Sequence, residues 1–340
     1  MKNRSKFVVS FISLFVAVLS CHCQNISPKD SLGPAQVPPE IQNPELLGIN
    51  KEPAHASLMP YASLTEALAA KRLSSTFCRS LNGMWKFNWV SWPQMRPEDF
   101  YKPEFNVSSW KEIPVPSNWQ LLGYGTPYYR NAGYIIKRDF PSVMSRPPKN
   151  FTAYEERNPV GSYRRDFELP ADWKDRQIFL TFDGVDAGFF LWINGMKVGY
   201  SVNSRNAAEF DITKYVKPGK NIVAAEVYRF TSGTWLEDQD MWRLSGIFRN
   251  VTLWSTPPEH IRDFFVKTVL DDQYLNASVE VTAKVKNYAA KKVKATTISA
   301  ILYDGKNAIA SSQAKSDVPV LEPGEEKTVS LIFPVTNPEK

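Results

Sequence analysis

Cysteine and histidine are scarce in this sequence, and their scarcity limits the chemistry that the chain can support. Its 340 residues include three cysteines and three histidines. Cys21 and Cys23 lie near the start, so Cys78 alone remains beyond them and a disulfide framework is excluded there. The histidines, at positions 22, 55 and 260, lack the close His or Cys spacing of metal sites. We therefore expect neither a structural disulfide nor a metal site.

Sequence signatures of several enzyme classes are also missing. The chain has no Gly-x-Ser-x-Gly segment, the nucleophile turn of α/β-type serine hydrolases. It has no Gly-x-Gly-x-x-Gly segment and no P-loop, so these two modes of nucleotide binding are not expected.

A strong charge of one sign is absent. The 41 basic residues exceed the 35 acidic ones by only six. The densest basic run lies partly on an alternating segment and reads as a solvated face: Lys284, Lys286, Lys291, Lys292 and Lys294. A phosphate-binding groove is the less favoured interpretation, because no aromatic residues are interleaved with these lysines. We therefore predict no nucleic-acid partner.

Only one long hydrophobic run exists, at the N-terminus. Phe7 to Leu19 is apolar and follows a basic stretch with Lys2, Arg4 and Lys6. This order is typical of a secretory signal peptide, and the run is too short for a membrane span. We therefore predict a signal peptide over residues 1–23 and no transmembrane segment.

Two types of signal peptide fit this segment. Cleavage after Cys23 would leave Gln24 as the first residue. Alternatively, Val18 to Cys21 forms a lipoprotein box with Cys21 acylated, although Leu19 fits that pattern poorly. Both interpretations predict an exported protein of the periplasm or cell envelope.

The rest of the chain favours an all-β fold. Residues 24–75 are rich in Pro, Asn and Ser, which predicts an extended arm with a short helix over Ser63–Ser74, capped by Thr65. Short apolar or alternating runs follow within residues 76–256, and they predict strands at 84–90, 162–169, 178–182, 189–193, 197–201, 221–230 and 248–254. The run Ile178–Phe182 is apolar throughout, as in a central strand, and Asn194-Gly195 predicts a hairpin turn. Many short strands without a long helix indicate a jelly-roll β-sandwich.

A second β domain is predicted over residues 257–340, after the Pro257-Pro258 linker. Alternation predicts five strands, with a hairpin turn at Asp304-Gly305. The pattern is immunoglobulin-like, and such a sandwich needs about seven strands. We therefore expect an incomplete sandwich with an exposed apolar edge, which should be the least stable part of the chain.

Several segments, in series, resemble the large β-galactosidases of glycoside hydrolase family 2. They cover about residues 43–340 and are Asn43-Pro44 with Pro53 and His55, Ser80-Leu-Asn-Gly-Met-Trp-Lys-Phe87, Val115-Pro-Ser-Asn-Trp-Gln120, Tyr128-Tyr-Arg-Asn-Ala-Gly-Tyr134, Asn158-Pro-Val-Gly-Ser-Tyr163, Phe182-Asp-Gly-Val-Asp-Ala187 and Leu236-Glu-Asp-Gln-Asp-Met-Trp-Arg-Leu-Ser-Gly-Ile-Phe-Arg249. A single Ser-Leu-Asn-Gly-x-Trp is modest evidence. The run from Leu236 is highly specific, and the whole series leaves little room for chance.

The resemblance implies a five-domain enzyme that hydrolyses terminal β-galactosides with retention. Its order would be a jelly-roll (galactose-binding-like) sandwich, an immunoglobulin-like sandwich, a catalytic (β/α)8 barrel and two further β domains. The two glutamates of catalysis belong to the barrel, which is absent from this sequence, so no catalytic residue is predicted here. Intact members of the family use Mg²⁺ and Na⁺, and no cofactor is predicted within this chain.

Asn131 and Asn203 are the substrate-binding candidates that the resemblance implies. Asn131 falls where the family's jelly roll reaches the active site, and an amide can donate to and accept from sugar hydroxyls. The alternative is an asparagine that stabilises the turn before Ala132-Gly133. Asn203 lies where these enzymes commonly have an aspartate associated with Na⁺ and the sugar. An amide keeps one oxygen ligand without the charge, so we expect weaker cation binding and retained hydroxyl binding; the alternative is a simple loop asparagine.

Other polar residues near these positions have structural interpretations. Ser204, Arg205 and Glu209 are expected to organise the loop around Asn203. Glu237, Asp238 and Asp240 form the densest acidic cluster beside tryptophans. An acid and a nucleophile there is one interpretation. The favoured one is that they hydrogen-bond a loop and help the sandwich dock against the barrel.

The sequence therefore predicts the non-catalytic N-terminal region of a retaining β-galactosidase, a truncated product that is inactive alone. Its ligand would be a β-galactoside sugar. A free-standing exported carbohydrate-binding module is the alternative. A third interpretation is association with a barrel-bearing chain encoded elsewhere, or formation of a homo-oligomer.

Overall fold

The computed structural model describes residues 36–131, 133–145, 155–237 and 240–338, all within one compact unit, Ala35–Lys340. The predicted signal peptide and the arm up to residue 35 lie outside these residues. Strands dominate the described part, and the prediction of an all-β fold is confirmed. The short helical elements are α1 (Leu64–Ala69) and single 3-10 turns at Pro39–Gln42, Arg72–Ser74, Pro93–Met95, Trp119–Leu122, Ala171–Trp173 and Ser232–Trp235.

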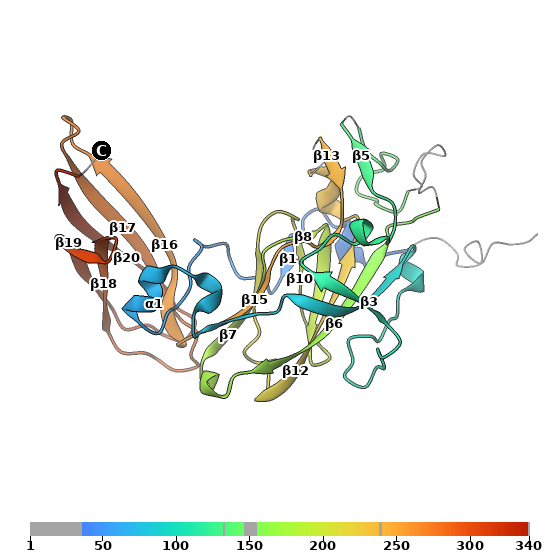
Figure 1. Ribbon diagram of the computed structural model, residues 1–340, viewed down its shortest axis with the longest axis horizontal. Helices are drawn as coiled ribbons and strands as arrows, with labels where there is room; N and C mark the ends of the chain where they lie inside the picture. Colours follow the sequence, from blue (N-terminus) through green and yellow to red (C-terminus); the bar gives the residue numbers. More distant parts are fainter. Residues whose placement is uncertain (1–35, 132, 146–154, 238–239, 339–340) are drawn as a thin grey trace, which may run out of the picture. The chain divides into compact units, whose positions relative to one another are not determined.

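The first sandwich is built on a seven-stranded antiparallel sheet (Figure 1). Its order is β1 (Gly48–Ile49), β10 (Met196–Val202), β9 (Gly188–Ile193), β12 (Gly219–Tyr228), β6 (Val160–Leu169), β3 (Gly83–Val90) and β4 (Lys111–Val115). A four-stranded sheet packs against it, in the order β11 (Ala208–Asp211), β7 (Gln177–Phe182), β15 (Val251–Thr256) and β2 (Cys78–Ser80). The largely apolar and fully buried β7 is an interior strand, as its sequence predicts.

Both faces of the larger sheet are buried, which explains why β9 is apolar at successive positions. Successive side chains of a strand point to opposite faces. Phe189 and Leu191 belong to the core between the two sheets. Phe190 and Trp192 belong to a second apolar cluster, which includes Phe100 and Ile41. The segments before β3, between β3 and β4, and between β4 and β6 therefore supply apolar residues that cover this second face.

The predicted turns and caps are only partly correct. Asn194 and Gly195 form the turn between β9 and β10, with φ values of 50° and 85°, as an Asn-Gly hairpin requires. The helix cap was assigned to the wrong residue. Ser63, not Thr65, caps α1 by accepting a hydrogen bond from the backbone N–H of Glu66. The helix ends at Ala69, and a separate 3-10 turn follows.

Two small strand pairs extend from the first sandwich, and neither was predicted. β13 (Met241–Arg243) pairs with β5 (Tyr128–Arg130), and β14 (Gly246–Ile247) pairs with β8 (Val185–Asp186). The strand expected at 248–254 corresponds to β15 (Val251–Thr256), which begins three residues later than predicted. Segments of two or three residues show no measurable periodicity, so sequence pattern does not reveal them.

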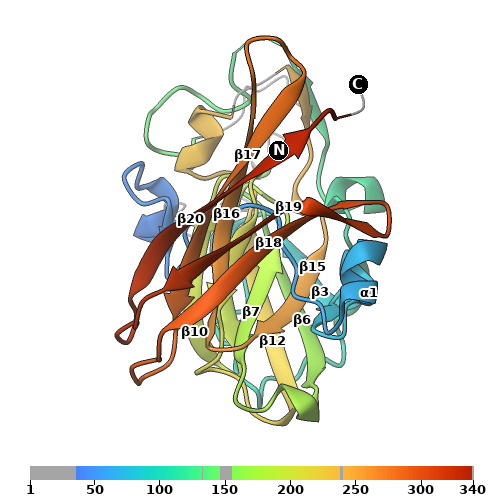
Figure 2. The same cartoon turned by 90° about the vertical axis from the view of Figure 1, so that its left-hand side faces the viewer.

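The second sandwich contains the five strands that the sequence predicts. β16 (Glu259–Leu270), β17 (Asn276–Asn287) and β20 (Glu326–Thr336) form one sheet, and β18 (Thr296–Asp304) pairs with β19 (Asn307–Val318). Figure 2 looks toward these strands, with β18 and β19 in front. The hairpin turn lies one residue later than expected, because Asp304 pairs with Asn307 and leaves Gly305 and Lys306 as the loop.

The core of this second sandwich is small and open at one end. Its fully buried apolar cluster consists of Val285, Val318 and Leu321. Away from that cluster, an apolar groove of about 590 Å³ opens between the sheets, lined by residues that include Val266, Leu270, Val279, Leu302 and Val335. Apolar side chains are therefore accessible in this groove, while the incomplete immunoglobulin-like sandwich stays a prediction.

Candidate functional site

Asn131 lies at the end of the strand pair β5–β13. Met241 pairs with Arg130, the residue just before Asn131, and Trp242 pairs with Tyr129. The rings of Tyr129 and Trp242 lie 5.6 Å apart, and the Tyr129 hydroxyl donates a 2.8 Å hydrogen bond to Asp240 Oδ1. Asn131 itself is exposed. The strand pair thus presents the Asn131 side chain at the surface on a supported segment.

Asn203 follows β10 directly and has an unusual backbone conformation. Its φ is 90°, which residues other than glycine seldom adopt and which asparagine tolerates better than most. The side chain is exposed, whereas the neighbouring Val202 and Ser204 are buried. The chain therefore turns at Asn203 and directs its amide outward.

The structure connects the segments of the two asparagines through a contact between the Arg205 and Met241 side chains. Within the residues described, no contact joins Asn131 to Asn203 directly. Arg205 approaches Met241, with 3.6 Å between Nη2 and the thioether sulfur, and Met241 is paired with Arg130. The loop of Asn203 and the strand pair of Asn131 are therefore neighbours at one end of the first sandwich.

Both amides are available to a ligand. In the described part of the chain, neither the Asn131 nor the Asn203 side chain has a hydrogen-bond partner. Each amide offers a carbonyl oxygen and an NH₂ group, which together match the donor and acceptor pattern of a neutral polyol. The arrangement can bind hydroxyl groups without supplying charge.

The two described members of the acidic cluster, Glu237 and Asp240, each have a different hydrogen-bond partner. Glu237 accepts hydrogen bonds from the backbone N–H and the hydroxyl of Ser204, at 2.7 and 2.5 Å. Asp240 is exposed and accepts from Tyr129. Asp238 lies outside the described residues. The interpretation of Glu237 as a loop-binding residue therefore fits the geometry.

Asp186 belongs to this site, although sequence reasoning did not single it out. Its carboxylate accepts a hydrogen bond from Arg205 Nη1 at 3.0 Å. Burial raises the pKa of Asp186 to about 6, and the guanidinium of Arg205 opposes that rise. Asp186 lies in Phe182–Ala187, one of the segments that carry the family resemblance, and that was the only sequence indication of its importance.

Glu209 does not organise the Asn203 loop, contrary to expectation. It lies on β11, and its Oε1 faces His55 Nε2 at 3.0 Å. Its Oε2 accepts from the Thr181 hydroxyl and from Trp254 Nε1. Glu209 therefore ties the N-terminal arm to the four-stranded sheet, whereas Ser204 and Arg205 are in the loop as predicted.

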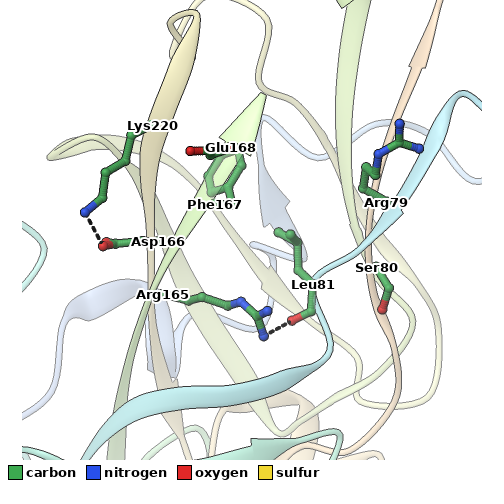
Figure 3. A pocket seen from close by; sticks show the side chains of 8 residues that line it. All are labelled: Arg79, Ser80, Leu81, Arg165, Asp166, Phe167, Glu168 and Lys220. Carbon is green, nitrogen blue, oxygen red and sulfur yellow. Dashed lines mark hydrogen bonds and ion pairs between the residues drawn. The ribbon is translucent and has the colours of Figure 1, made fainter. Parts of the chain in front are cut away.

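Another hollow, of about 510 Å³, lies between β2 and β6 (Figure 3). Several of its charged groups are already engaged by the protein. Lys220 Nζ lies 2.7 Å from Asp166, and Arg165 donates to the carbonyl oxygens of Leu81 and Asn82. This hollow contains neither asparagine candidate, so the surface around Asn131 and Asn203 remains the better site.

The described residues lack a clustered set of metal ligands and a membrane-spanning helix. There, no group of three or more His, Cys, Asp or Glu side chains is close enough to hold a metal ion. The same residues contain no helix of the length and apolarity that crossing a membrane requires.

Comparisons with known proteins agree with this fold. The family model described as glycosyl hydrolases family 2, sugar binding domain, matches residues 78–257. A β-galactosidase of Priestia megaterium is 42% identical over 314 residues, which cover 90% of this chain and 29% of that protein. A β-galactosidase large subunit of Lactobacillus acidophilus is 36% identical over 272 residues, or 77% of this chain and 43% of that protein.

A solved structure of a Bacteroides uniformis β-glucuronidase has the same fold. Its TM-score is 0.60 at 23% identity, over 77% of this chain and 28% of that one. The chain thus spans less than half the length of each of these relatives. Since the family model covers more than half of the sequence, the chain belongs to glycoside hydrolase family 2, and residues 78–257 are its sugar-binding domain.

Proposed function

We propose that this chain is the non-catalytic N-terminal region of a retaining β-galactosidase. The observation that carries the proposal is the 42% identity to the Priestia megaterium β-galactosidase across 90% of the chain. In this proposal residues 76–256 form the jelly roll and residues 257–340 an immunoglobulin-like sandwich. The ligand is a terminal β-galactoside.

Asn131 and Asn203 would form one wall of the galactoside site. Their exposed amides bind hydroxyl groups and orient the sugar, while they exchange no proton and carry no charge. Retaining hydrolysis needs two carboxyl groups about 5–5.5 Å apart, one as nucleophile and one as acid and base. Glu237 is occupied by Ser204, and Asp240 by Tyr129. Catalysis therefore requires carboxylates from a barrel, and this chain alone would be inactive.

A metal contributes no step to this proposal. Members of the family use Mg²⁺ and Na⁺, and a cation at Asn203 would find one neutral amide oxygen. The two carboxylates near that loop are engaged, Asp186 by Arg205 and Glu237 by Ser204. The residues present therefore do not fit a sodium site on their own.

The partner in this proposal is a barrel-bearing polypeptide that covers the surface around the two asparagines. Large apolar side chains are exposed there: Leu236 by 84%, Phe140 by 63%, Trp242 by 57% and Tyr129 by 55%. Apolar side chains gathered in this way are typical of an interaction surface. The Lactobacillus acidophilus relative is itself named a large subunit, which supports assembly from more than one polypeptide. A homo-oligomer is the other assembly we propose to test.

We also propose export to the periplasm or cell envelope. The support is the sequence of residues 1–23, with three basic residues before the apolar run Phe7–Leu19. Expression of the full chain with and without these residues, followed by fractionation, would test the proposal. Retention of both forms in the cytoplasm would contradict it.

Hydrolysis of a chromogenic β-galactoside tests the main proposal. The purified chain should show no activity alone and should give activity when mixed with a family 2 polypeptide that carries the barrel. In that mixture Asn131→Ala and Asn203→Ala should raise KM. Activity of the isolated chain that is lost in Asp240→Asn would overturn the proposal, because it would place catalysis in the sandwich.

An exported carbohydrate-binding module is a second candidate. The two unengaged amides beside exposed aromatic rings favour it, since aromatic faces stack on sugar rings. Titration of the isolated chain with glycans distinguishes the candidates. Micromolar affinity without any effect of a barrel-bearing polypeptide would support the module.

A further inference from the structure

The loop that carries Asn203 needs support, because its conformation is intrinsically unfavourable. A φ of 90° at a residue other than glycine costs conformational free energy and persists only where surrounding contacts impose it. The exposed Asn203 side chain makes no such contact within the described residues. The support must therefore come from the residues beside it.

Ser204 is held by a single carboxylate. Its backbone N–H donates to Glu237 Oε1 at 2.7 Å, and its hydroxyl donates to Glu237 Oε2 at 2.5 Å. Ser204 is fully buried, so water has little access to its two donors. Hydrogen bonds to an ionised acceptor are shorter and stronger than neutral ones. Glu237 therefore fixes both donors of the residue that follows Asn203.

Arg205 is held at three further points. Its guanidinium pairs with Asp186 at 3.0 Å and lies 4.9 Å from the centre of the Phe248 ring. Its backbone carbonyl accepts a 2.8 Å hydrogen bond from Arg249 Nη1. These contacts come from two separate segments, β8 and the end of the run Leu236–Arg249. They prevent the loop from relaxing on its C-terminal side.

We propose that Glu237 and Asp186 are positioning residues, which hold the backbone after Asn203 so that its amide faces a bound galactoside. The inference rests on the proposed sugar contact of Asn203 and deepens it. It assigns part of the Leu236–Arg249 run a role within this chain, in addition to docking. It also explains why a carboxylate beside the site is not a catalytic group: both oxygens of Glu237 are committed to Ser204.

Site-specific amide exchange measured by NMR tests the support directly, without any sugar. In Glu237→Gln the Ser204 amide should exchange about tenfold faster, because one charge-assisted acceptor is lost. Glu237→Asp keeps the charge and should recover part of the protection. Glu66→Gln is the matched control, since Glu66 also accepts from a backbone N–H and a hydroxyl, of Ala62 and Thr76, in the N-terminal arm. It should leave Ser204 unchanged.

Unchanged Ser204 exchange in Glu237→Gln would overturn the inference, as would an equal change in Glu66→Gln. If Glu237→Gln does not fold, Glu237→Asp and Asp186→Asn decide by the same measurement. Titration with methyl β-galactoside then separates this inference from the proposed function. If the sugar shifts the Asn203 signals of the wild type and binds about tenfold more weakly to Glu237→Gln, both the inference and the proposed sugar contact are supported. A wild type in which neither asparagine responds refutes the sugar contact, while the exchange data still decide whether Glu237 holds the loop.

Discussion

His55 should stabilise the first sandwich most strongly at acidic pH. Its Nε2 lies 3.0 Å from Glu209 Oε1, and its Nδ1 lies 2.7 Å from the carbonyl oxygen of Ala56. Both partners are acceptors, so only the doubly protonated ring can donate to both. The side chains of His55 and Glu209 are 15% and 11% exposed. The hydrogen bond that His55 donates to Glu209 raises the pKa of His55, and burial opposes this rise.

The direction of the pH effect follows from that raised pKa. A histidine whose pKa is higher in the folded than in the unfolded chain stabilises fully below its unfolded pKa. This stabilisation is lost as the pH rises through the folded pKa. A hydrogen bond to a charged group contributes about 1.5–3 kcal/mol. Because Glu209 keeps the donors of Thr181 and Trp254, we expect His55→Ala to cost about 2 kcal/mol at pH 5.5 and about 1 kcal/mol at pH 8.5.

Urea unfolding followed by tryptophan fluorescence measures this effect selectively. All ten tryptophans lie between Trp85 and Trp254, so the emission reports the first sandwich alone. Burial lowers the pKa of His260 to about 4 in the wild type, so this second histidine is mostly neutral at both pH values and adds little to the difference. An equal cost at the two pH values, or a larger one at pH 8.5, would refute the reasoning. Glu209→Gln should remove the pH dependence in the same way.

Three further predictions concern packing, a carboxyl group and the second sandwich. Gly161→Ala should lower the free energy of unfolding by about 1–3 kcal/mol, because the new Cβ would lie 2.5 Å from Trp119 Cζ3; unchanged urea midpoints would contradict this. Arg205→Met should raise the pKa of Asp186 above its value of about 6, since Arg205 lowers it; carboxyl ¹³C NMR would show the midpoint, and no shift would contradict the assignment. Amides of β16–β20 should exchange with deuterium faster than those of β7, β9 and β12, because so few apolar side chains are fully buried between their sheets. Equal amide protection in the two sets of strands, measured by mass spectrometry, would show that the open groove does not lower the stability of the second sandwich.

The strands that the sequence predicted are those with enough residues to show a pattern. β6, β12 and β17 each have ten or more residues, and segments of this length are long enough for alternation or apolar content to be recognised in the sequence. The Asn194-Gly195 turn was predictable because two successive positive φ values select these residues. Asn131 and Asn203 were found through the family resemblance, since an exposed asparagine in a loop has no distinguishing local pattern.

The contacts around the site could not be predicted, because they join residues far apart in sequence. Glu209 follows Ser204 and Arg205 closely, which made a shared loop the simplest expectation. The expectation was wrong because Ala208 begins the strand β11, which directs Glu209 toward His55 instead. Closeness in sequence does not predict closeness in space where a strand begins, because each residue of a strand advances the chain by about 3.3 Å.

Glu237 and Asp240 show the same principle at the site itself. Three positions apart in a helix, they would share one face, but this segment leaves a 3-10 turn at Trp235 and enters β13 at Met241. Glu237 consequently binds Ser204, while Asp240 binds Tyr129 on the paired strand. Each carboxylate thus braces a different asparagine-bearing segment: Glu237 the loop of Asn203, and Asp240 the strand that leads to Asn131. Glu237 and Asp240 are therefore better understood as structural residues that hold the two segments for which we propose sugar contacts.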